Sequence, residues 1–275
     1  MLNALSDGFA SLIKRPPVVS VLRLNGAIGG GGFGRGLTDA ALAPLVERAF
    51  APKKLAAVAL SINSPGGSPV QSALIAARIR RLADEKSIPV IAFCEDVAAS
   101  GGYWLATAAD EIYADENSIL GSIGVIYAGF GFQALLEKQG VERRVHTAGR
   151  SKSMLDPFLP EQEDDVERIK RLQTVIHDNF IQQVRTRRAA KLKESDDLFT
   201  GEIWVGREAE TVGLIDGVGH LVPLMKAHFG DKLRFNVIAP KRSLFRKLGG
   251  PGVEDMLNGA AGMVEERALF ARYGL

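Results

Sequence analysis

Ser100 and Lys152 are the two residues whose types and settings favour covalent catalysis. Ser100 follows an apolar run that ends near residue 95 and precedes an Ala-rich stretch with helical character. A hydroxyl at a strand-to-helix junction meets the positive end of the helix dipole and has free backbone N–H groups beside it. Alanines before the serine and glycines after it leave space for a substrate chain. Ser100 is therefore a candidate nucleophile, and an ordinary N-cap serine is the alternative interpretation.

A serine nucleophile needs a base, and histidine is the first type to seek. The four histidines are His146, His177, His220 and His228. None stands in a setting that distinguishes it, and the chain has no H-E-x-x-H segment or close histidine pair that would predict a metal site. Lysine is the other known base, in the Ser/Lys variant of the catalytic triad. Lys152, in a loop with apolar residues close by, is the candidate, with a solvated surface lysine as the alternative.

Alternating apolar runs and helical patterns must position these residues. Strands are predicted at residues 18–28, 55–63 and 89–95, each followed by a glycine-bearing loop and a helical pattern. This alternation predicts an α/β layered fold. The remaining predictions are helices at 38–50, 69–85 and 101–110 and short strands at 111–114, 123–127 and 143–147. Residues 161–193 carry apolar side chains at steps of three and four, which predicts a long amphipathic helix that serves as an arm.

Composition excludes several classes of partner. The 275 residues are 46% hydrophobic and 24% charged, with a formal net charge of +2, so nothing favours a nucleic-acid partner. Cys94 is the only cysteine, which rules out an internal disulfide and predicts a small core residue.

Residues 1–17 hold no apolar run of signal-peptide or membrane-spanning length. Their apolar face predicts packing against this or a neighbouring subunit, with a peripheral membrane contact as the alternative.

The glycine tract at residues 29–34 satisfies the G-x-G-x-x-G pattern of dinucleotide sites. Four successive glycines satisfy that pattern almost automatically, and the next strand ends in Asn63, where an acidic ribose ligand is expected. We therefore favour a flexible loop over a dinucleotide site.

Five segments together resemble the signal peptide peptidase family of Ser/Lys proteases, the SppA and SohB group (peptidase family S49). They are residues 62–67 (INSPGG), 98–110, 121–125 (GSIGV), 149–153 (GRSKS) and 213–216 (GLID). The resemblance covers roughly residues 18–219. It implies that Ser100 is the nucleophile and Lys152 the general base. The N–H groups of Gly67 and Gly101 would then form the oxyanion hole, while Ser122 and Ser151 would hydrogen-bond the lysine.

The resemblance implies a fold of the ClpP/crotonase type, a spiral of ββα units. It also implies no cofactor, a homo-oligomeric ring with sites where subunits meet, and signal peptides or other unfolded apolar segments as substrates. Such peptides would bind in an extended form along residues 121–128. ClpP proteases place a histidine about one helix beyond the serine, and residues 120–125 hold none. Two alternatives remain open: a catalytically silent peptide-binding scaffold and a crotonase-like enzyme that binds acyl-CoA.

The expected organisation is one peptidase domain over residues 18–240, including the arm, between an N-terminal extension (1–17) and a C-terminal extension (241–275). Family members usually carry an N-terminal membrane anchor, and residues 1–17 do not resemble one. The sequence therefore favours a cytoplasmic or membrane-peripheral location.

Overall fold

The computed structural model describes residues 16–29, 36–149, 151–193, 195–239 and 267–275. Most of the glycine tract, the N-terminal apolar face and the Gly-Pro-Gly segment at 250–252 lie outside the described residues. Within the described ranges, no helix combines the length and the apolar character needed to cross a membrane.

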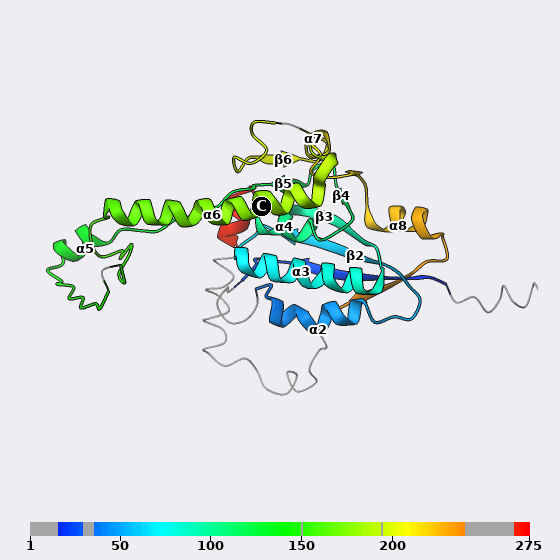
Figure 1. The fold of residues 1–275 in the computed structure, drawn as a ribbon, viewed down its shortest axis with the longest axis horizontal. Coiled ribbons are helices and arrows are strands. Elements are labelled where there is room, and N and C mark those ends of the chain that lie inside the picture. The colour runs from blue at the N-terminus through cyan, green and yellow to red at the C-terminus, as the bar shows by residue number, and fades with distance from the viewer. Residues whose placement is uncertain (1–15, 30–35, 150, 194, 240–266) are drawn as a thin grey trace, which may run out of the picture.

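A mainly parallel sheet forms the centre of the molecule (Figure 1). Its main path runs β6-β5-β3-β2-β1-β8, with β4 paired to β3 and β7 paired to β4. Among the strand pairs of the described residues, only β5–β6 is antiparallel. The strands are β1 (Val18–Asn25), β2 (Leu55–Ser64), β3 (Val90–Ala99), β4 (Glu111–Ala114), β5 (Ile119–Gly121), β6 (Ile203–Val205), β7 (Gly217–Val218) and β8 (Arg234–Ile238).

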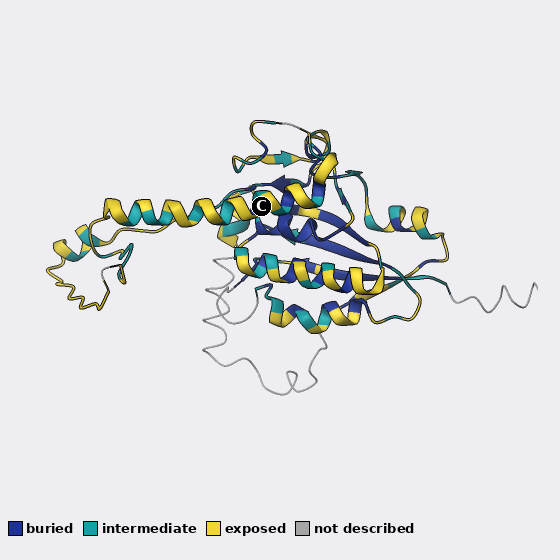
Figure 2. Ribbon diagram, viewed as in Figure 1, coloured by how far each residue is buried: buried dark blue, intermediate teal, exposed yellow. Residues whose placement is uncertain are grey.

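Helices cover both faces of this sheet, as expected for near-continuous apolar strands. They are α2 (Asp39–Ala49), α3 (Pro69–Lys86), α4 (Gly101–Ala106), α5 (Gln133–Lys138), α6 (Glu163–Arg188), α7 (Arg207–Thr211) and α8 (Leu221–Phe229), with a short 3₁₀ helix at Ala189–Lys191. The larger core packs α2, α3 and α4 on one face, and a smaller core around Phe93 and Met225 packs α8 on the other. Figure 2 shows the central strands almost wholly buried.

The predicted α/β alternation is confirmed, but several local predictions are wrong. Strand β3 continues to Ala99 because Ala98 pairs with Ser64 of β2 and Leu120 of β5. Residues 119–121, rather than 123–127, form the next strand, since they find partners in both β3 and β6. Residues 143–147 are exposed and form no strand. Helix α4 also ends at Ala106 instead of residue 110.

The predicted long helix is present as α6, which extends away from the sheet with α5 at its far end (Figure 1). The part that projects differs from the helix predicted as an arm at residues 161–193, because it starts before α5 and ends within α6; from here on, the arm means residues 125–149 and 151–172. The C-terminal half of α6 packs on α4, where the rings of Phe180 and Trp104 stack with centroids 4.8 Å apart. The Gln183 amide also donates to the Thr107 hydroxyl (3.0 Å). The part of α6 that follows the arm is therefore attached to the helix that follows Ser100.

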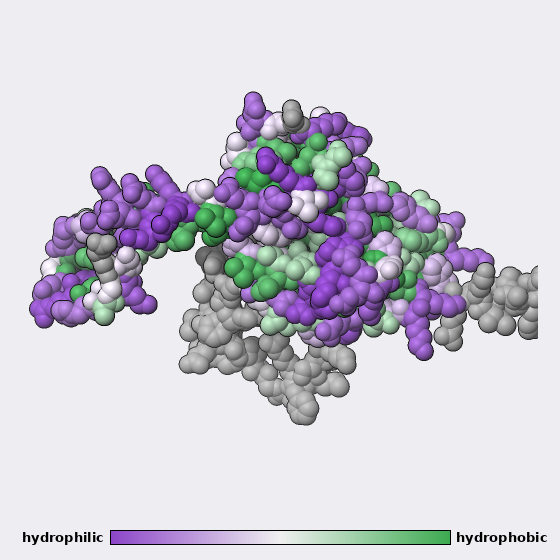
Figure 3. Space-filling view, in the orientation of Figure 1, coloured by the Kyte–Doolittle hydropathy of each residue, from purple (hydrophilic) through white to green (hydrophobic). Residues whose placement is uncertain are grey.

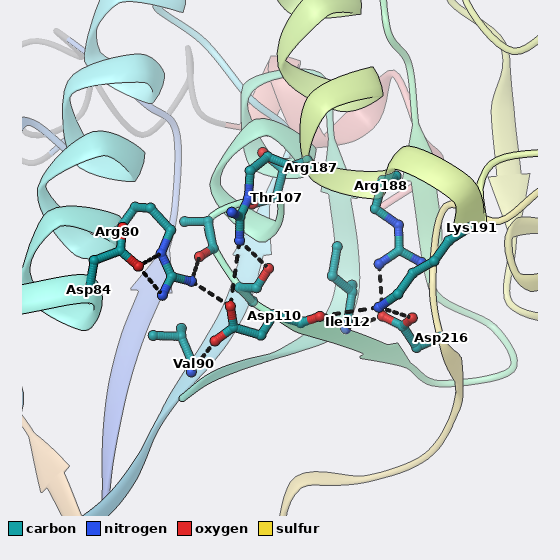
Figure 4. A network of polar contacts seen from close by, with 12 residues as sticks. Arg80, Asp84, Val90, Thr107, Asp110, Ile112, Arg187, Arg188, Lys191 and Asp216 are labelled. Atoms are coloured by element: carbon teal, nitrogen blue, oxygen red, sulfur yellow. Dashed lines mark hydrogen bonds and ion pairs between the residues drawn. The ribbon is translucent and has the colours of Figure 1, made fainter. Parts of the chain in front are cut away.

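A polar network anchors the last turn of α6 (Figure 4). Arg187 donates to the carbonyl of Thr107 (2.8 Å), and Arg188, only 2% exposed, pairs with Asp216 (2.8 Å). Asp216 also pairs with Lys191 (2.7 Å) and accepts from the amide of Ile112 (2.8 Å). Burial raises the pKa of Asp216, but its bonds to Arg188, Lys191 and Ile112 outweigh burial, so the pKa lies below its usual value. The network holds α6 in one direction relative to the sheet.

Candidate active site

Ser100 stands directly between β3 and α4 in a conformation that is unusual for a residue with a side chain. Its φ is 52° and its ψ is −123°, and its hydroxyl makes no capping hydrogen bond to α4. The backbone is held on both sides: the N–H donates to Gly121 (2.8 Å), and the carbonyl accepts from Trp104 (3.0 Å). Positive φ values cost energy outside glycine and concentrate at functional sites. Ser100 thus occupies the N-cap position of α4, but within the described residues its hydroxyl does not cap the helix as that of an ordinary N-cap serine would.

The glycines after β2 lie against this junction. A Cβ built on Gly66 would lie 2.8 Å from both Ser100 Cβ and Gly101 N, so only glycine fits there. Gly67 is exposed, with φ of 141°. Among the described residues, neither Gly67 nor Gly101 donates its N–H to a backbone carbonyl. The first N–H groups of a helix have no partner within it, so Gly101 can donate to a bound group.

Ser122 lies beside the same junction, one residue beyond the carbonyl that holds Ser100. It has a positive φ of 49°, and its N–H donates to Glu202 (2.7 Å). The hydroxyl of Tyr273 approaches Ser122 Oγ to 3.4 Å. Residues 267–275, red in Figure 1, therefore lie next to this loop. The sequence alone does not predict that contact.

Lys152 and Ser151 lie elsewhere, in an exposed turn of the arm between α5 and α6. The amide of Leu155 donates to Asp165 (3.1 Å), which ties this turn to the first residues of α6. Ser100 belongs to the other end of α6, where Phe180 meets α4. Asp165 and Phe180 are about 22 Å apart along the helix axis at 1.5 Å per residue. One chain thus brings together Ser100, Gly67, Gly101 and Ser122, and leaves Lys152 and Ser151 on the arm.

The histidines do not supply a base in this structure. His146 is exposed in the arm, and His220 lies 3.3 Å from a carboxylate oxygen of Asp115. The ring of His177 lies 2.9 Å from the carbonyl of Ile123, a contact that sequence reasoning missed because α6 reaches this loop only through tertiary packing. None of the histidines is hydrogen-bonded to Ser100 in the described part of the chain. The described part of the chain also contains no cluster of three or more His, Cys, Asp or Glu residues that could hold a metal ion.

Comparison with known proteins identifies the family. Residues 83–227, just over half of the chain, match the model described as peptidase family S49. A serine protease SPPA of Arabidopsis thaliana chloroplasts is 33% identical over 218 residues, which cover 77% of this chain and 31% of that protein. A Brucella melitensis protein named Na(+)/H(+) antiporter NhaA is 50% identical over 271 residues, which cover 94% of this chain and 37% of that protein. The chain thus spans only about a third of the length of either relative.

A solved structure shows the same fold. It is the 1510-N membrane-bound stomatin-specific protease, as a lysine-to-alanine mutant in complex with a substrate peptide. It superposes with a TM-score of 0.53 at 14% identity, over 89% of this chain and 99% of that one. The fold is the ClpP-like α/β fold expected from the sequence. The chain belongs to peptidase family S49, a family of serine peptidases.

Proposed function

We propose that this chain is a serine endopeptidase in which Ser100 is the nucleophile and Lys152 the general base. The observation that carries the proposal is the uncapped hydroxyl of Ser100, held at a strained strand-to-helix junction beside two glycines with available N–H groups. We propose residues 18–240 as the domain that performs this reaction.

In the proposed reaction, Ser100 Oγ attacks the carbonyl carbon of the scissile peptide bond while neutral Lys152 takes the hydroxyl proton. The N–H groups of Gly67 and Gly101 donate to the oxyanion that forms, and losing one such donor typically costs about 3 kcal/mol of transition-state stabilisation. The lysine then gives its proton to the leaving amine. In the second half of the reaction, Lys152, neutral again, takes a proton from the water that attacks the acyl-enzyme. It returns this proton to Ser100 Oγ as the bond between the acyl group and the serine breaks and the acid product leaves.

The lysine in each site is proposed to come from a neighbouring copy of the chain. Lys152 lies on the arm, at the opposite end of α6 from the helix that follows Ser100. Large apolar side chains are exposed along the arm, among them Ile126, Phe130 (82% exposed) and Leu135. Figure 3 shows apolar atoms at the tip of the arm and where it joins the body. Such exposure marks interaction surfaces, and a repeated head-to-tail contact forms a ring when its rotation closes, which is the assembly we propose.

Burial at the contact between two copies would also favour the neutral form of the lysine, which the role of general base requires. Lys152 is exposed in the isolated chain. Removal from water disfavours the charged form of a lysine, and only the neutral amine can accept a proton. Ser122, and Ser151 from the arm, are proposed to hydrogen-bond that amine after assembly.

The proposed substrates are unfolded apolar polypeptides, including signal peptides. Residues 123–128, directly after β5, belong to no strand, and Ile126 and Tyr127 are exposed there. An extended peptide can add to such a segment through main-chain hydrogen bonds. Family membership favours this reaction over the acyl-CoA alternative.

The test is hydrolysis of a fluorogenic apolar peptide by the parent chain and by Ser100→Ala and Lys152→Ala. Lys138→Ala, which changes another exposed lysine of the arm, is the matched control. We expect activity in the parent and the control and none above background in the two site variants, all at equal assembly. Activity that survives in Ser100→Ala would remove its role as nucleophile. A folded, assembled parent that binds the peptide without cutting it would favour the silent scaffold.

A further inference from the structure

Ile28 lies where the two proposed oxyanion donors meet, although it belongs to neither of their loops. It follows the end of β1 and is 4% exposed. Its N–H donates to the carbonyl of Gly66 (2.8 Å), and its carbonyl accepts from the N–H of Ser68 (2.8 Å). These two bonds form an isolated parallel bridge between Ile28 and Gly67. The main chain of Ile28 therefore brackets the glycine that carries the first donor.

The planar peptide bond between Gly66 and Gly67 fixes the direction in which the Gly67 N–H points. The carbonyl of Gly66 and the N–H of Gly67 belong to one planar trans peptide and point to opposite sides. Because Ile28 holds the carbonyl, the Gly67 N–H faces away from Ile28. Gly66 itself lies against Ser100. The donor direction is thus set by a hydrogen bond from another segment of the chain.

The side chain of Ile28 lies close to Gly101, the residue that carries the second donor. Its Cδ1 atom lies 3.3 Å from the position that a Cβ of Gly101 would take. The backbone of Leu37 holds both neighbours of Ile28. Gly29 donates to the carbonyl of Leu37 (2.9 Å), and Leu37 donates to the carbonyl of Ala27 (2.9 Å). Ile28 consequently fixes the Gly67 peptide through its backbone, and its terminal methyl group occupies space beside Gly101.

We propose that Ile28 is a positioning residue for the oxyanion hole and holds the Gly67 and Gly101 N–H groups in the relation that one oxyanion requires. This inference rests on the proposed function. The residue touches no substrate, and it acts only through the two glycines. Its effect belongs to the transition state, where the carbonyl oxygen becomes negative, and not to binding of the ground-state peptide.

Ile28→Val tests this proposal, because valine keeps both branches at Cβ and lacks only the δ methyl group. Ile79→Val is the matched control, since Ile79 is fully buried in α3 and belongs to the same core. We expect kcat for peptide hydrolysis to fall about five- to tenfold in Ile28→Val with KM unchanged, less than for outright loss of a donor. Inhibition by a peptide aldehyde, whose adduct with Ser100 carries an oxyanion, should weaken by the same factor.

Two further measurements distinguish a failure of the Ile28 proposal from a failure of the proposed endopeptidase function. Peptide binding, measured by fluorescence anisotropy in the Ser100→Ala background, should be the same with and without the additional Ile28→Val substitution. If Ser100→Ala abolishes hydrolysis but Ile28→Val and Ile79→Val have equal kcat and equal aldehyde inhibition, Ile28 is only a core residue and this inference falls. If Ser100→Ala keeps the parent activity, the proposed function itself fails.

Discussion

Glycine is required at position 67 by space as well as by backbone conformation. Its φ of 141° disfavours any side chain, and a Cβ there would collide with the carbonyl of Ile28. We predict that Gly67→Ala lowers kcat/KM by about two orders of magnitude, as for loss of an oxyanion donor. Steady-state hydrolysis of the fluorogenic peptide measures the change.

The control for that substitution is Gly201→Ala. Gly201 also has a positive φ, 93°, but a Cβ there would meet nothing within 4 Å. It therefore carries the conformational cost of alanine without a collision at the site. Equal losses of activity in Gly67→Ala and Gly201→Ala would assign the effect to backbone strain and remove the special role of Gly67.

At the level of secondary-structure elements, Asp216 is the carboxylate that joins the end of α6 to β4. Its pKa is lowered in the folded chain, so it stabilises the fold above the pKa of an unfolded aspartate, and this contribution is lost as pH falls through the folded pKa. We predict that Asp216→Asn lowers the free energy of unfolding by about 2 kcal/mol at pH 7, through lost charged hydrogen bonds. The difference from the parent should begin to shrink below about pH 4, where the carboxylate of the unfolded parent starts to take up a proton while that of the folded parent stays charged.

Urea unfolding of both proteins from neutral to acidic pH measures this dependence. Asp178→Asn serves as control, because Asp178 is an exposed carboxylate on the same helix. A difference between Asp216→Asn and the parent that stays constant over this pH range would show that the charge of Asp216 is not the source of its contribution.

At the level of the whole molecule, assembly decides whether the proposed dyad exists. Ser100→Ala and Lys152→Ala should each be inactive alone, yet a mixture allowed to exchange subunits should regain activity. In a randomly mixed head-to-tail ring, about one quarter of the sites would join an intact serine to an intact lysine from the neighbour. Hydrolysis measured before and after exchange, normalised to the parent, tests this number.

A mixture of Ser100→Ala with the double variant Ser100→Ala/Lys152→Ala must stay inactive, because no copy in it has the serine. Absence of recovery in the first mixture, with exchange confirmed by labelled subunits, would exclude a lysine from a neighbouring copy. In that case the arm of the same chain would have to move Lys152 toward Ser100.

Much of the candidate site can be predicted from the sequence, because the residues that indicate it stand close together in short motifs. An apolar strand, a serine and a run of small residues stand next to one another, so the sequence alone predicts the strand-to-helix junction at Ser100. The period of apolar residues likewise predicted α6. The motifs around Ser100 and Lys152 led to the family, and its fold was confirmed.

What only the tertiary structure decided depends on contacts between distant residues. Strand β3 reaches Ala99, and residues 119–121 form β5, because neighbouring strands pair there, which no local pattern reports. Ile28 meets Gly67 across a parallel bridge for the same reason. Lys152 stands in a glycine- and serine-rich motif that resembles a catalytic segment, but the direction of α6 carries that motif away from Ser100. The sequence by itself determines which groups are present for the proposed reaction, and long-range packing determines which of them one chain brings together.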